Sequence, residues 1–300
     1  MNNTLVSVNI LSFNRKDELR NTLQKVFEQD YKNIEVIVVD NASIDGTAKM
    51  VQSDFPEAKL ISLPKNIGIS GWNYALEVAS GDYILLLDDD SYPSADSIEK
   101  AKLFFERNKS VSIIAAKVIN NNSGIIETSS FNERPNFFVG CGAFIKRDVI
   151  EKIGGFNQLI FIYLHELDYC ARCYDYGFEI RYVKNVIVYH NLSNERSKWK
   201  NEDPFKTSFR FHHYFISYSI FLLQRFYPKY IIIYIPKWIV NRFIIAISYR
   251  YFKEFFSAVF HLIKICKKII SGRRVLKETT QHFYNNGNIP FIDPEYFNKK

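Results

Sequence analysis

Cysteine is scarce in this chain of 300 residues, and its spacing excludes several kinds of site. There are four cysteines, and only Cys170 and Cys173 form a Cys-x-x-Cys pair. Without a second pair, a zinc ribbon is not expected. A thioredoxin-like redox site would need a different surrounding pattern. The two cysteines are therefore predicted to lie on one helix as small buried side chains.

Two further features are missing near the amino terminus. Residues 1–4 lead straight into an apolar stretch and lack the charged and apolar regions of a signal peptide, so a cytoplasmic location with reduced thiols is expected. No Gly-x-Gly-x-x-Gly follows the first predicted strand, which argues against a standard NAD site.

Acidic residues are almost absent from residues 205–274, a stretch rich in lysine, arginine and aromatic side chains. The chain as a whole has a formal net charge of +7 and 47% hydrophobic residues, a composition typical of globular proteins. Because the positive charge is concentrated locally, an anionic surface is the expected partner. The cations alternate with Ile and Phe and no nucleic-acid-binding module is recognised, so nucleic acid is not expected to bind.

Strands and helices alternate through the first two thirds of the sequence. This order predicts an α/β domain with a mostly parallel sheet flanked by helices. We expect this domain to cover residues 1–203 and a helical, aromatic and basic region to cover residues 204–300, with breaks at Pro228 and Pro236. Strands are predicted at 5–13, 35–39, 59–63, 83–87, 111–118, 179–183 and 186–189, and helices after 14, at 47–51, at 71–79 and after 147.

Three consecutive carboxylates, Asp88, Asp89 and Asp90, follow the apolar run 83–87. Open α/β sheets bind ligands just beyond the carboxyl ends of their strands, and oxygen ligands suit Mg²⁺ or Mn²⁺. A divalent cation would relieve the repulsion among the three charges. The alternative is a solvated turn that uses aspartate as a cap or loop residue.

Four segments, taken in order, resemble those of the family 2 glycosyltransferases, GT-A-fold enzymes that use nucleotide-activated sugars. The segments cover about the first 200 residues, and the set is more specific than any one of them. They are VSVNILSFNR at 6–15, VIVVDNASIDGT at 36–47, NIGISGWN at 66–73 and LDDD at 87–90.

The resemblance implies a site for the sugar donor. Asp40, at the end of a strand, can accept the N3–H of a uracil or thymine ring, and its alternative role is a helix cap. Trp72 could stack on a sugar or base, or belong to the core. The donor-binding residues implied are Ser12, Asn14, Arg15, Asp40, Asn66, Trp72, Asn73, Asp88 and Asp89.

The resemblance also implies the catalytic groups. Asp90 and His190 would hold Mn²⁺ or Mg²⁺, and imidazole suits Mn²⁺ better, although a lone His at a strand end can be merely polar. Glu166 takes the position of the general base that deprotonates the acceptor, the alternative being helix capping. Asp168 would orient the helix through Arg172. The acceptor and sugar pocket would include Gly140, Cys141, Gly142 and Asp168.

These features together predict a metal-dependent, inverting, rhamnosyltransferase-like enzyme of bacterial surface-polysaccharide synthesis. It would transfer a sugar from a UDP- or dTDP-sugar to a glycan, in particular a lipid-linked one. Residues 230–247 are interrupted by Pro236, Lys237, Asn241 and Arg242, which favours an in-plane anchor on the inner face of the cell membrane over a membrane span. The alternatives are a lid or a homodimer contact for this region, and a non-catalytic nucleotide-binding or membrane-scaffold protein.

Overall fold

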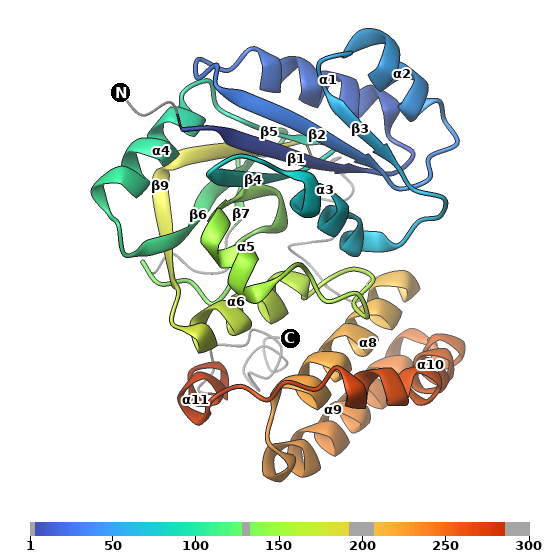
Figure 1. The fold of residues 1–300 in the computed structure, drawn as a ribbon. Helices are drawn as coiled ribbons and strands as arrows, with labels where there is room; N and C mark the ends of the chain where they lie inside the picture. The colour runs from blue at the N-terminus through green and yellow to red at the C-terminus, as the bar shows by residue number, and fades with distance from the viewer. Residues whose placement is uncertain (1–3, 128–132, 192–206, 286–300) are drawn as a thin grey trace.

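A mixed β-sheet forms the centre of the molecule in the computed structural model, which describes residues 4–127, 133–191 and 207–285 (Figure 1). The strand order is β3-β2-β1-β4-β8-β6-β9-β5, and β7 pairs with β6. The strands are β1 (Val6–Ser12), β2 (Ile34–Asp40), β3 (Lys59–Ser62), β4 (Tyr83–Asp88), β5 (Ser91–Pro93), β6 (Val111–Asn120), β7 (Ile126–Glu127), β8 (Ala143–Lys146) and β9 (Glu179–His190).

The first four strands in the order are parallel, as the alternation of strands and helices predicts. β1 pairs in parallel with β2 and β4, and β2 pairs in parallel with β3. Beyond β4 the sheet is mixed, because β8 runs antiparallel to both β4 and β6. β5 is likewise antiparallel to β9. β5 and β8 have four residues or fewer, too short for the sequence pattern to reveal them.

β9 is one continuous strand, whereas the sequence predicts two strands at 179–183 and 186–189. It pairs in parallel with β6 along its length, and the register shifts between the pairs Ala116–Val183 and Lys117–Ile187. The residues between the two predicted strands therefore lie within β9, where the pairing with β6 is irregular, as in a β-bulge. This strand delivers His190 to the same edge of the sheet as β5.

Helices cover both faces of the sheet and bury apolar side chains against it. Helices α1, α2 and α4 pack on one face through residues such as Leu23, Met50 and Phe105, and α3, α5 and α6 pack on the other. The helices are α1 (Lys16–Phe27), α2 (Thr47–Asp54), α3 (Trp72–Val78), α4 (Ser97–Arg107), α5 (Arg147–Ile153) and α6 (His165–Tyr176), with short 3-10 turns η1 (Gly68–Gly71) and η2 (Gly140–Gly142).

The C-terminal region is helical, as predicted. Pro228 occupies the start of α9, where the break was expected, but Pro236 lies inside that helix and does not end it. Cys170 and Cys173 are buried and unpaired on α6, as their spacing predicts. The helices of this region are α8 (Ser208–Arg225), α9 (Pro228–Tyr249), α10 (Phe252–Ser271) and α11 (Glu278–Asn285).

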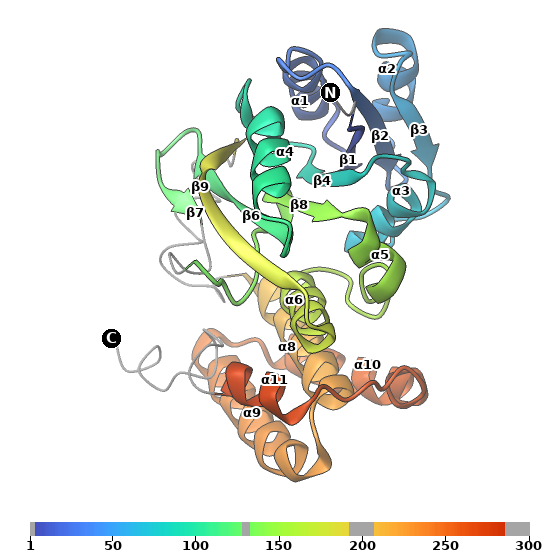
Figure 2. The same ribbon diagram turned by 60° about the vertical axis from the view of Figure 1, so that its left-hand side comes forward.

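The C-terminal helices pack against the rest of the chain through α6, which lies between the sheet and α8 in both ribbon views (Figures 1 and 2). One apolar core runs without interruption from Leu11 of β1 to Tyr284 of α11. A buried ion pair crosses the junction, because Arg225 of α8 donates to Asp168 of α6 from Nε at 2.6 Å. The predicted boundary at residues 203 and 204 lies outside the described residues.

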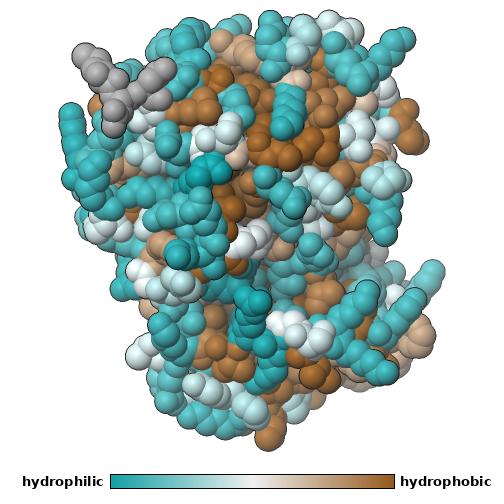
Figure 3. Space-filling model, viewed as in Figure 1, coloured by the Kyte–Doolittle hydropathy of each residue, from teal (hydrophilic) through white to brown (hydrophobic). Residues whose placement is uncertain are grey.

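Helix α9 has the length and apolar composition of a membrane span, and it is the one helix in the described part of the chain that does. The polar residues that interrupt the sequence do not shorten it. Trp238, Arg242 and Ala246 are buried in the bundle, while Ile232 on its outer side is 73% exposed. Hydrophobic residues lie among charged ones over the lower part of the molecule, where α8 to α10 lie (Figure 3).

Candidate active site

The carboxyl ends of β1, β2 and β4 meet at one edge of the sheet. The ladder sets Ser12 opposite Asp40 and Leu11 opposite Asp88. Ligands of open α/β sheets bind at such an edge. The fold therefore brings together the ends of three of the four segments that suggested a donor site.

The loops leaving β1 and β2 are held in left-handed backbone conformations. Asn14 has φ 53° and Ala42 has φ 67°, values that residues with a Cβ rarely adopt. Two hydrogen bonds of 2.8 Å connect the two loops. The backbone N–H of Asn14 donates to Ser43 Oγ, and Asn14 Oδ1 accepts from the backbone N–H of Ile44. Asp40 Oδ1 accepts from the Ser43 amide at 2.9 Å. Strained turns of this kind cluster at ligand sites.

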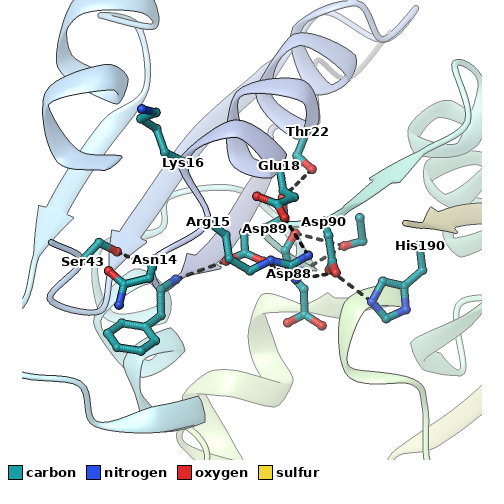
Figure 4. Close-up of polar contacts among 12 residues, drawn as sticks. Asn14, Arg15, Lys16, Glu18, Thr22, Ser43, Asp88, Asp89, Asp90 and His190 are labelled. Carbon is teal, nitrogen blue, oxygen red and sulfur yellow. Dashed lines mark hydrogen bonds and ion pairs between the residues drawn. The ribbon is translucent and has the colours of Figure 1, made fainter. Parts of the chain in front are cut away.

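Arg15 ties together two of the three consecutive aspartates. Its Nη1 lies 2.5 Å from Asp90 Oδ2 and 3.2 Å from Asp89 Oδ1. Asp89 also accepts from the Phe13 amide, so it serves to fix the β1 loop. In Figure 4 the Asp88 carboxylate points to the opposite side from Arg15 and Glu18. The three neighbouring carboxylates thus have three different surroundings.

His190 lies beside the aspartates at the end of β9. Its Nε2 is 3.2 Å from Asp90 Oδ1 (Figure 4), and its Nδ1 is 3.1 Å from Glu127 Oε1. Ligand atoms of His190, Asp88 and Cys141 all lie within 4.8 Å of one another. The group offers a carboxylate oxygen, an imidazole nitrogen and the sulfur of the buried Cys141. Carboxylate and imidazole donors suit a divalent cation such as Mn²⁺.

The charges of this cluster are unbalanced in a way that favours a cation. Burial, and then the charge of Asp90, raise the pKa of Asp88 to about 6. Burial would also raise the pKa of Asp90, but His190 and Arg15 hold it below its usual range. Although burial lowers it, the pKa of His190 is raised well above 6.5 by Cys141, Asp90 and Glu127. A field that stabilises a protonated imidazole also attracts a metal ion.

The turn η2 passes directly beneath the start of α6. A Cβ on Gly140 would lie 3.1 Å from Glu166 Oε1, 3.1 Å from His165 Nε2 and 3.5 Å from Trp72. Glu166 is also close enough to Asp88 to contribute to its raised pKa, after burial and Asp90. A Cβ at position 140 would push the side chains of Glu166 and His165 away by a few tenths of an ångström, and glycine avoids this. The predicted base and the predicted Gly-rich loop thus share one site with the aspartates.

Two left-handed residues immediately precede α6, the helix that carries Glu166. Tyr163 has φ 64° and Leu164 has φ 58°, although neither is a glycine. Their conformation sets the direction in which α6 begins, and so where Glu166 lies. No sequence signal marks this strain, because both residues are of types that avoid the left-handed region.

Several predicted ligand-binding side chains have structural partners instead. Trp72 is 1% exposed and packs on Phe156 and His165, so it takes its alternative role in the core. Asn73 exchanges two hydrogen bonds with the backbone of Phe156. Asn66 closes its own turn by accepting from the Gly68 amide.

The structure does not bring Asp168 into the pocket. It is completely buried, and its expected contact with Arg172 is present, with Nε to Oδ2 at 3.0 Å. Arg225 donates from Nε to the other carboxylate oxygen, Asp168 Oδ1. Glu127 is a residue that sequence reasoning missed, since only the folding of β7 onto β6 brings it to His190.

Burial of His165 predicts a measurable dependence of stability on pH. Burial lowers the pKa of His165 to about 3. As the pH falls below about 6.5, this imidazole is therefore protonated in the unfolded chain but stays neutral in the folded one. The contribution of His165 to the free energy of unfolding is complete above pH 6.5 and is lost as the pH falls toward 3, and at pH 5 this contribution should be smaller by about 2 kcal/mol. Asp88, whose pKa is raised, changes stability in the opposite direction over this range, so the effect of His165 is the difference between the unmodified protein and His165→Phe. Urea denaturation at about pH 7.5 and pH 5 measures this loss. His165→Phe should lose correspondingly less, and an equal loss in both proteins would contradict the assignment.

The strand order of the sheet, with an acidic cluster at the ends of its parallel strands, is that of the GT-A fold. A solved mannosyltransferase, PcManGT from Pyrobaculum calidifontis in complex with GDP-Man and Mn²⁺, superposes with a TM-score of 0.57 at 18% identity and covers 98% of this chain and 82% of its own. TarS of S. aureus (residues 1–349, with UDP-GlcNAc) also gives 0.57 at 18% identity, covering 73% and 66%. At these identities the likeness concerns the fold.

The model of glycosyl transferase family 2 matches residues 7–167, and this chain belongs to that family. It is 28% identical over 199 residues to WfaP of Escherichia coli, a UDP-Glc:alpha-D-GlcNAc-diphosphoundecaprenol beta-1,3-glucosyltransferase, covering 63% of this chain and 77% of that protein. It is 26% identical over 221 residues to the dTDP-rhamnosyl transferase RfbF of Shigella flexneri, covering 66% and 72%. The resemblance read from the four segments is confirmed.

Proposed function

We propose that this protein is a metal-dependent inverting glycosyltransferase that uses a UDP- or dTDP-sugar. The acceptor would be a lipid-linked glycan of a bacterial surface polysaccharide. The observation that carries the proposal is the convergence of Asp88, Gly140 and Glu166 at the carboxyl ends of the parallel strands. The named activities of WfaP and RfbF support a nucleotide-sugar donor, and that of WfaP supports a lipid-linked acceptor.

In the proposed reaction, the sugar is transferred in one displacement. Glu166 takes the proton of the acceptor hydroxyl, and that oxygen attacks the anomeric carbon from the side opposite the leaving group. The bond from the anomeric carbon to the diphosphate oxygen breaks as the new bond forms, so the configuration inverts and the nucleoside diphosphate leaves. Asp40 would accept the N3–H of the uracil or thymine ring.

Asp90 and His190 would hold the divalent ion, and Asp88 would contact the ribose of the donor or the groups around the ion. When bound, the ion would supply positive charge against the diphosphate that departs. Glu127 would keep His190 oriented through the contact to Nδ1, because carboxylates commonly fix metal-binding imidazoles in this way. Mn²⁺ suits an imidazole ligand better than Mg²⁺ does.

The C-terminal helices would hold the enzyme against an anionic membrane from the cytoplasmic side. Phe256 and Phe260 of α10 are 61% and 69% exposed, and lysines flank them along the same helix. Exposed apolar residues beside cations are typical of helices that lie in a membrane surface. This arrangement would place the site near lipid-linked acceptors.

The metal site is tested by Asp90→Asn. Without one carboxylate, affinity for Mn²⁺ should fall by more than the roughly 10- to 100-fold that loss of an outer-shell partner costs. Calorimetric titration with Mn²⁺, and with UDP- and dTDP-sugars in its presence, measures this fall and identifies the donor. Glu99→Gln, an exposed acid on α4, is the matched control, and a thermal melt confirms that both variants fold. If the unmodified protein binds no nucleotide sugar with metal present, the proposal fails.

A further inference from the structure

A basic pocket lies away from the acidic candidate active site, where the loop after α5 meets the C-terminal helices. It is an open pocket of about 530 Å³, within the range of small-molecule sites. Its walls come from the loop around Asn157, from α6, from the end of α8, and from the end of α10 with the residues after it. Neither Glu166 nor the aspartates of the active site line it.

The lining of this pocket is strongly cationic. Arg172, Arg225, Lys268 and Arg274 line it, and no carboxylate does. Asp168 lies behind the wall and pairs with Arg172 and Arg225, which leaves an excess of three positive charges. Four cations held together without an equal number of anions repel one another, and a bound anion would relieve this repulsion.

Two of these cations are fixed in place and retain donors. Arg225 donates through three N–H groups, two of them to Asp168 and one to the Arg274 carbonyl. Arg172 likewise uses three, to Asp168 and to the carbonyls of Ile153 and Gly155. A guanidinium has five N–H donors, so in the part of the chain that the structure describes each has two without a partner.

The remaining two cations carry no ion pair among the described residues, and they lie at the open side. Lys268 is on the last turn of α10 and Arg274 follows that helix. Gly272 lets this segment approach α8 closely, because a Cβ there would lie 2.7 Å from Gln224 Nε2. The pocket is thus formed by a packed junction with two exposed cations, Lys268 and Arg274, at its edge.

The mouth opens beside the apolar surface of α10. Ile270, between Lys268 and Ser271, is 69% exposed, and Ile263, about two helical turns earlier on the same side, is 64% exposed. An anionic group carried on a hydrocarbon chain could therefore enter the pocket while its chain remains on that surface. Guanidinium groups are especially suited to phosphate oxygens, which they bind in pairs.

We infer that this pocket binds a phosphate or diphosphate group of a lipid at the membrane surface. Under the proposed function the diphosphate of a lipid-linked acceptor is the source that fits, and this assignment of the source rests on that function. The inference that the pocket binds an anion does not depend on the proposed function. The pocket would then hold the acceptor's anionic end while its sugar reaches Glu166, about six residues back along α6.

The test is a calorimetric titration of the full chain with inorganic pyrophosphate and, separately, inorganic phosphate, in EDTA so that no metal-dependent donor site contributes. Lys268→Gln with Arg274→Gln should weaken pyrophosphate binding by about 10-fold or more, because two charge-assisted contacts are lost. The control is Lys264→Gln with Lys267→Gln, which removes the same charge from exposed positions of the same helix outside the pocket. That pair should change the affinity less than about 2-fold. Equal effects of the two pairs, or no binding by the unmodified protein, would overturn the inference.

Vesicles distinguish the sources of the anion. Flotation would be compared with vesicles of phosphatidylcholine alone, with phosphatidylglycerol added, and with a polyprenyl diphosphate added. Selective loss of binding to the polyprenyl diphosphate vesicles in the Lys268 and Arg274 variant identifies a lipid diphosphate, and selective loss with phosphatidylglycerol identifies a phospholipid headgroup. Equal losses in the two charge variants on every vesicle would overturn a lipid source. Because these measurements use no sugar donor, they can succeed even if the transferase proposal fails.

Discussion

Glu166→Gln is expected to lower turnover by roughly 10²- to 10⁴-fold, the range over which a positioned general base contributes. The amide keeps the size of the side chain and its place against Gly140, but it cannot take the proton of the acceptor hydroxyl. Donor binding should be nearly unchanged, because this carboxylate is proposed to act on the acceptor. Single-turnover transfer and equilibrium donor binding, measured on the same preparation, separate the two effects.

The result can also exclude a purely structural role for Glu166. If its function were only to cap α6, the variant would lose stability and retain its rate per folded molecule. A thermal melt beside the kinetic assay distinguishes these cases. Turnover within a few fold of the unmodified enzyme would remove Glu166 as the base, whereas no turnover by the unmodified protein would favour a non-catalytic nucleotide-binding or scaffold protein.

Asp168→Asn is expected to lower the free energy of unfolding by about 3–5 kcal/mol, the cost of leaving a buried charge without its partner. The carboxylate is completely buried and accepts from both Arg172 and Arg225. The amide is isosteric but carries no charge to balance the guanidinium groups. Urea denaturation at neutral pH measures the change.

Glu151→Gln is the control for this experiment, since it removes a carboxylate from an exposed position of α5 and should change stability by less than about 0.5 kcal/mol. Adding Arg225→Met to Asp168→Asn should recover part of the loss, because the unpaired buried cation is then removed as well. A loss below about 1 kcal/mol in Asp168→Asn would show that solvent reaches this junction and replaces the carboxylate.

The sequence predicted best what depends on local pattern. The apolar runs ending at Asp40 and Asp88 became β2 and β4, and the register of parallel strands then required their ends to meet. It failed where the outcome depends on distant contacts. β8 has four residues and is recognisable only by its neighbours β4 and β6. Pro236 looked like a break, yet it lies within the continuous helix α9.

The candidate site shows the same division. Glu166, Gly140 and the aspartates were identified by residue type and order, and the fold places them together. Trp72 and Asn73 belong to the same sequence segment, but their side chains face Phe156 and serve packing. Sequence order cannot tell whether a side chain in the first turn of a short helix faces a ligand or the core. Glu127 was missed because a two-residue strand brings it to His190.

The unbroken apolar core has a consequence for how this enzyme could be divided experimentally. Since Leu11 and Tyr284 belong to the same cluster of buried side chains, the amino-terminal sheet and the carboxyl-terminal helices form one cooperative unit of folding. Cutting the chain between them would expose the underside of α6 to water and leave two aggregation-prone fragments. The proposed membrane attachment should therefore be separated from catalysis by surface substitutions, and not by truncation.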